Sequence, residues 1–134
     1  MKKYKGQTKN DCIAACVRTL INDENVPHCF NNIQEEKDII KAWEDLRAFL
    51  ASKNLFLTLF SSEDPWEEMS MNNPDIPYML LCETASHTNH AVVCKNDCII
   101  HDPSPLKQEI IGPHTLFNTW IIGVIGCLPK GYDE

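Results

Sequence analysis

The stretch QTKNDCIAACVRTL, residues 7–20, contains the start of the first predicted helix and two of the seven cysteines. Apolar residues recur at helical spacing between residues 11 and 22, and Asn10 or Asp11 supplies a side chain that can cap the first turn. At about 100° per residue, Cys16 falls within the apolar arc, whereas Cys12 lies about 110° from its centre. The spacing therefore predicts a buried Cys16 and a Cys12 that points away from the core.

Downstream of this helix the pattern of apolar residues changes from helical to strand-like. A loop is predicted over 26–32 and a second amphipathic helix over 33–53. Strands are predicted over 55–60, 77–83, 90–95, 97–102 and 120–128, with a polar loop and one helical turn near Trp66 between the first two. Helices followed by strands predict an α+β fold, and the length of 134 residues predicts a single domain over 1–134.

Composition narrows the classes of function. Apolar residues make up 43% of the chain, but no run approaches the roughly 20 apolar residues that a membrane helix needs. The basic N-terminus lacks an apolar segment, so we expect no secretory signal and a mature chain that starts near Met1. A net charge of -7 argues against nucleic acid and anionic lipid as partners. Seven cysteines without an export signal predict free thiols in a reducing cytoplasm.

Cys12 has the position of an activated nucleophile. It lies in the first turn of the predicted helix, where unpaired backbone N–H groups and the positive end of the helix dipole favour a thiolate. We therefore expect a lowered thiol pKa, and the thiolate is the form that attacks a carbonyl.

Three further residues supply the other parts of such a site. His90 begins one arm of a predicted tight hairpin, with its turn at Lys95-Asn96-Asp97, and Asp102 ends the other arm. The two are expected at the same end of this ribbon, where a carboxylate can hold a histidine that acts as base. Gln7 carries a side-chain amide just upstream of the helix, which suits an oxyanion donor.

These segments resemble the papain-like cysteine peptidases, and most of all the bacteriocin-processing peptidases that cleave double-glycine leaders. In that family a Gln precedes an Asp-Cys-Gly-x-Ala segment at a helix start, and a strand-initial His is followed by a segment ending in Asp-Pro. Here the matching segments are QTKNDCIAAC, HAVVCKND and IIHDPSP, with Ile13 in place of the usual glycine. Small phage-encoded proteins are similar in plan.

The resemblance implies a papain-like fold and a role for each of the four residues. Cys12 would be the nucleophile, His90 the general acid and base, Asp102 its orienting group and Gln7 the oxyanion donor. It implies a peptide or protein substrate and no cofactor. Similarity to phage proteins implies the host cytoplasm as location and a host or phage protein as target.

Alternative interpretations of the same residues stay open. One is a catalytically idle papain-like domain that binds and inhibits a host defence protein. Another is a zinc site at Cys94 and Cys98, which flank a turn, or at Cys12 and Cys16, which repeat their spacing. A third pairs His101 with Cys98, with His101 facing the opposite side from Asp102.

Overall fold

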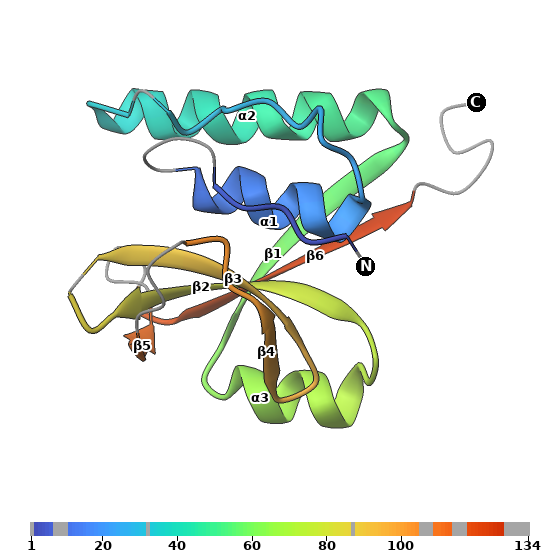
Figure 1. The fold of residues 1–134 in the computed structure, drawn as a ribbon, viewed down its shortest axis with the longest axis vertical. Helices are drawn as coiled ribbons and strands as arrows, with labels where there is room; N and C mark the ends of the chain where they lie inside the picture. The colour runs from blue at the N-terminus through green and yellow to red at the C-terminus, as the bar shows by residue number, and fades with distance from the viewer. Residues whose placement is uncertain are drawn as a thin grey trace.

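The computed structural model describes residues 2–6, 11–31, 33–86, 88–104, 109–113 and 118–127. In them, helices α1 (Cys12–Ile21) and α2 (Glu36–Ser52) lie on one side of a six-stranded antiparallel sheet (Figure 1). The strands are β1 (Leu55–Ser62), β2 (Pro77–Thr84), β3 (Asn89–Lys95), β4 (Cys98–His101), β5 (Ile110–Pro113) and β6 (Trp120–Cys127). The predicted α+β class, with N-terminal helices packed on a small antiparallel sheet, is confirmed.

The ends of α1 differ in how their backbone groups are satisfied. Asp11 occupies the N-cap position, but its side chain makes no capping hydrogen bond. Of the two residues expected to cap the first turn, Asp11 therefore does not do so, and Asn10 lies outside the described residues. Its carboxylate is instead turned toward Arg18. At the other end Asn22 has a positive φ of 54° and its backbone N–H donates to the Arg18 carbonyl, which closes the helix in a left-handed turn.

Helix α2 begins three residues later than predicted because a capping box forms in front of it. The Glu35 side chain accepts the backbone N–H of Asp38, and the Asp38 carboxylate accepts the backbone N–H of Glu35 at 3.0 Å. The apolar pattern begins at Ile33, but this residue precedes the cap and packs against the core from the loop.

Strand order in the sheet is β1-β6-β2-β3-β4, and β5 pairs with the end of β2. The predicted hairpin is present: β3 and β4 pair in antiparallel register, and Asn96 in the turn has a positive φ of 55°. β5 was not predicted. The helical turn predicted near Trp66 is α3 (Pro65–Glu67), which continues into a π-helical turn, η1 (Glu68–Asn72), that the sequence did not indicate.

The two faces of the sheet bury different side chains, as alternation along a strand requires. Leu81, Ala91 and Val93 face the helices and enclose Cys16, which is fully buried as predicted. Tyr78, Leu80, Val92 and Cys94 face the other way and pack with Met69 of η1. The three tryptophans are partly buried and pack at the margins of the core clusters; they are Trp43, Trp66 and Trp120.

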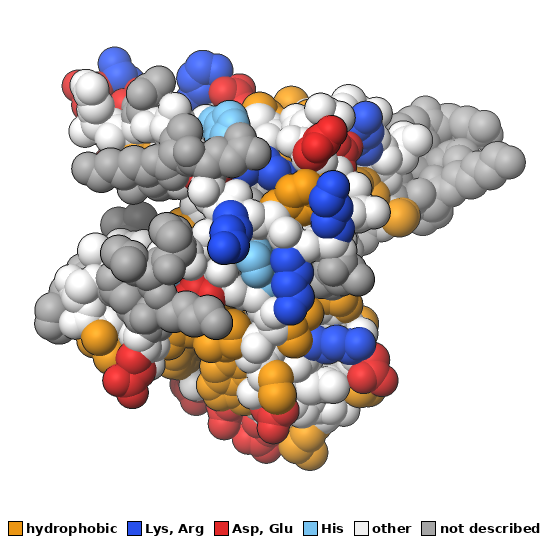
Figure 2. Space-filling view, in the orientation of Figure 1, with side chains coloured by type: hydrophobic (Ala, Val, Ile, Leu, Met, Phe, Trp, Pro, Cys, Tyr) orange, Lys and Arg blue, Asp and Glu red, His pale blue; other side chains and the backbone are white. Residues whose placement is uncertain are grey.

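The surface carries its charges unevenly. Figure 2 shows lysine and arginine side chains across the middle of one face and acidic side chains gathered at its lower end, where α3 lies in Figure 1. Among the described residues, no helix combines the length and hydropathy that crossing a membrane would take.

Candidate functional site

Cys12 is the first residue of α1 and is half-buried. It packs at the margin of the cluster formed by Cys16, Leu81 and Ala91, so the prediction that it points clear of the core is only partly met. Cys12 and Cys16 nevertheless differ in exposure, because Cys16 is fully enclosed between α1 and the sheet.

Burial decides the protonation state of Cys12. The pKa of its thiol is raised above the usual value, because the surroundings desolvate the thiolate. Backbone N–H groups of Ala91, Ile13 and Cys12 itself act in the opposite direction, and the Asp11 carboxylate adds to the increase. The expectation of a lowered pKa is therefore wrong: the helix start does present its N–H groups, but loss of solvent outweighs them. Burial therefore favours the neutral form of the Cys12 thiol.

His90 and Asp102 form a close, shielded pair. Nε2 of His90 lies 2.7 Å from Oδ1 of Asp102, and the two side chains are 11% and 15% exposed. The backbone N–H of Ser104 donates to the same carboxylate oxygen at 2.9 Å. Because an ionised carboxylate only accepts, Nε2 carries the hydrogen in the neutral ring, and Nδ1 is left as the basic nitrogen. Asp102 therefore sets both the tautomer and the orientation of His90.

The start of α1 lies beside the start of β3. The backbone N–H of Ala91, the residue after His90, approaches the Cys12 thiol and favours its ionised form. Cys82 pairs with His90 across the sheet, and the pKa of its thiol, raised to about 12, rises first through burial and then through the nearby Cys12 and Asp102. Within the described residues, the hydrogen bond of the His90 ring is to Asp102 and not to Cys12.

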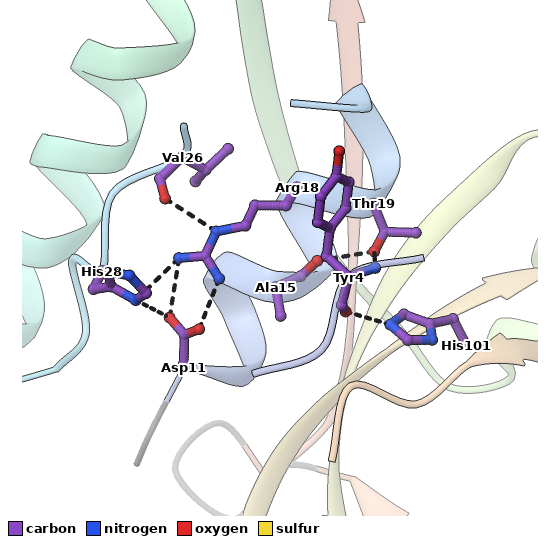
Figure 3. A network of polar contacts seen from close by, with 8 residues as sticks. All are labelled: Tyr4, Asp11, Ala15, Arg18, Thr19, Val26, His28 and His101. Carbon is purple, nitrogen blue, oxygen red and sulfur yellow. Dashed lines mark hydrogen bonds and ion pairs between the residues drawn. The ribbon is translucent and has the colours of Figure 1, made fainter. Parts of the chain in front are cut away.

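The N-terminal segment, residues 2–6, lies across α1 and the end of β4 (Figure 3). The backbone N–H of Tyr4 donates to Thr19 Oγ1 at 3.0 Å, and Nε2 of the buried His101 donates to the Tyr4 carbonyl. The backbone N–H of Gly6 donates to the Pro103 carbonyl at 3.0 Å, next to Asp102. Gln7, the predicted oxyanion donor, lies outside the described residues.

A buried ion pair immediately precedes Cys12, and the sequence did not indicate it. Nη1 of Arg18 lies 2.7 Å from Oδ2 of Asp11, and both side chains are 1% exposed. Nε of Arg18 donates to the Val26 carbonyl at 3.1 Å, and Nδ1 of His28 lies 2.9 Å from Asp11 Oδ1 (Figure 3). The one sequence feature that could have suggested this pair is its spacing, because residues seven apart lie on the same face of a helix, two turns from one another. The pair ties the start of α1 to its last turn and to the following loop.

The alternative cysteine and histidine sites do not assemble in the described part of the chain. Cys94 is buried and Cys98 is exposed, on opposite arms of the hairpin. His101 donates to the Tyr4 carbonyl, while the Cys98 thiol contacts Asp97, so these two do not pair. No group of three potential ligands suited to a metal ion occurs among the described residues. His87 and His114 lie outside them.

A comparison with known families finds no family model that matches the chain, and no curated protein matches it either.

Proposed function

We propose that the chain is a thiol-dependent amide hydrolase of papain-like fold that acts on a peptide or protein. The observation that carries the proposal is the shielded His90–Asp102 pair, 2.7 Å apart, at the start of a strand whose next residue contacts the Cys12 thiol. A histidine held by a carboxylate is the base that a neutral thiol needs. Because burial raises the pKa of Cys12, the thiol depends on such a base more than an exposed thiol would.

The reaction proceeds in two stages. Nδ1 of His90 takes the proton from the Cys12 thiol as its sulfur attacks the amide carbonyl carbon, and Gln7 donates a hydrogen bond to the oxyanion. The C–N bond then breaks as the His90 imidazolium gives its proton to the leaving amine, which leaves a thioester on Cys12. Water, deprotonated by His90, attacks the thioester, and the carboxylic acid and free thiol are released. No cofactor takes part, and the setting we propose is the cytoplasm of a phage-infected host.

One observation favours a second candidate function, an idle domain that binds a host protein. Burial raises the pKa of the Cys12 thiol, as is expected for a cysteine that no longer acts as a nucleophile. In that case the pair formed by His90 and Asp102 would serve only to hold the hairpin end in place.

Iodoacetamide labelling of Cys12 at pH 7.5, followed by peptide mass spectrometry, separates these functions without knowledge of the substrate. If His90 accepts the thiol proton, His90→Ala lowers the labelling rate by about 10²-fold, within the range that general bases supply. Asp102→Asn, which disturbs the tautomer, should lower it by a smaller factor. Cys98 is exposed and should label at the same rate in all proteins. Equal labelling of Cys12 with and without His90 would refute the hydrolase and leave the idle domain.

A further inference from the structure

A groove of about 800 Å³ lies between the first half of α2 and strand β1. Its volume is in the range that accommodates small ligands or a few side chains of a peptide. Apolar side chains from the loop before α2, from one face of α2 and from strand β1 line the groove. They are Ile33, Ile39, Ile40, Trp43 and Leu59. The described site residues Cys12, His90 and Asp102 do not line it.

The groove combines an aromatic side chain that packs against the core with an exposed apolar side chain. Trp43 packs edge to face on Phe30, with the ring centroids 4.9 Å apart, which holds the indole in one orientation. Ile40, one turn earlier on α2, is 56% exposed. A rigid aromatic beside an exposed isoleucine is a surface that gains free energy when another apolar side chain covers it.

The charges at the rim select the kind of partner. Glu35, Glu36 and Glu44 line the groove together with Arg47. Glu35 forms an ion pair with Lys37 at 3.1 Å, and the Arg47 guanidinium lies over the Trp43 ring at 6.0 Å from its centroid. Glu36 and Glu44 lie two turns apart on α2 and leave a rim that favours positively charged groups.

The groove adjoins the helix that carries Cys12. Trp43 and Leu59 pack against the same buried cluster as Cys12 and Ile13, the first two residues of α1. A polypeptide bound in the groove would therefore lie against the layer of side chains that also supports the candidate nucleophile.

We propose that this groove binds a polypeptide segment in which an apolar side chain is flanked by lysine or arginine. The apolar side chain covers Ile40 and Trp43, and the basic side chains pair with Glu36 and Glu44. Binding of this kind needs no chemistry at Cys12, so it belongs equally to a hydrolase that recognises its substrate and to an idle domain that recognises a partner.

The test uses Cys12→Ala protein, which prevents turnover, and fluorescein-labelled synthetic peptides measured by fluorescence anisotropy. One peptide carries Lys-Leu-Phe-Lys at its centre, a second carries Glu-Leu-Phe-Glu, and a third carries Lys-Ser-Ser-Lys. The first peptide should bind about tenfold more tightly than either of the others. It alone offers both apolar side chains for Ile40 and Trp43 and positive charges for the glutamates of α2. Equal affinity for all three peptides, or no binding of the first at millimolar concentration, would overturn the proposal.

Substitutions on the groove locate the binding. Ile40→Ser should weaken binding of the Lys-Leu-Phe-Lys peptide about tenfold, whereas Ile99→Ser, at an isoleucine of β4 that is 46% exposed, should leave it unchanged. Glu36→Lys with Glu44→Lys should reverse the preference between the lysine and glutamate peptides, and Glu67→Lys with Glu68→Lys near α3 should not. Equal effects of the groove and control variants would place binding elsewhere and refute the assignment. Since His90-dependent labelling of Cys12 does not involve the groove, each proposal can fail without the other.

Discussion

Replacement of Arg18 by methionine tests the ion pair that precedes Cys12. In the native protein the Arg18 guanidinium contacts Asp11 at 2.7 and 3.3 Å and donates to the Val26 carbonyl at 3.1 Å, and its side chain is 1% exposed. Methionine fills much of the same volume, but it leaves the Asp11 carboxylate buried without its guanidinium partner and removes the donor to Val26. Removal of one member of a buried pair costs about 3–5 kcal/mol, a third or more of the stability of many domains.

Urea denaturation followed by tryptophan fluorescence measures this loss. A double-mutant cycle adds a sharper test, because Asp11→Asn removes the charge that Arg18→Met leaves unpaired. The double variant should therefore be destabilised by less than the sum of the single variants, by about 1–3 kcal/mol. Loss of under about 1 kcal/mol in Arg18→Met, or additive effects in the cycle, would show that the pair contributes no more than a surface ion pair does.

Further predictions concern the cysteines. Cys16→Ala should lower the free energy of unfolding by about 1 kcal/mol through a small core cavity, and an unchanged urea midpoint would contradict this. Burial raises the pKa of Cys82 to about 12, while an unfolded thiol titrates near pH 8.5. Stability from this group is thus complete below about pH 8.5 and falls as the pH rises, because the unfolded chain releases its proton first. As the pH is raised, the urea midpoint of Cys82→Ala protein should fall less than that of the native protein. Ellman's reagent should modify exposed Cys98 and Cys127 before denaturation and Cys16 and Cys82 only after it; early modification of all four would contradict the burial.

The state of Cys12 bears on how an active site of this kind would work. Desolvation raises the pKa of its thiol and so favours the neutral form, and the adjacent Asp11 charge acts in the same direction. Arg18 neutralises that charge at 2.7 Å, so the ion pair limits the penalty for forming a thiolate at the next residue. We therefore expect Arg18→Met to slow labelling of Cys12 as well as to destabilise the fold, and Cys98 labelling in the same sample serves as the control.

Elements whose signals are local could be predicted from the amino-acid sequence. The apolar stripe around Cys16 marked α1, the longer stripe through Leu46 and Leu50 marked α2, and the turn residues at Asn96 marked the hairpin of β3 and β4. It also indicated that His90 and Asp102 would meet, because a tight hairpin brings the ends of its arms together whatever else the chain does.

Tertiary structure decided what depends on residues far apart in the chain. β5 has a short and weak pattern of its own and exists through pairing with the end of β2. Asp11 has the residue type of a helix cap, but its position inside the fold makes Arg18 and His28 its partners. The pKa of Cys12 follows the same logic: the helix start alone favours a thiolate, while the sheet packed against it removes the solvent that a thiolate requires. Local sequence sets backbone geometry, but desolvation is a property of the assembled fold.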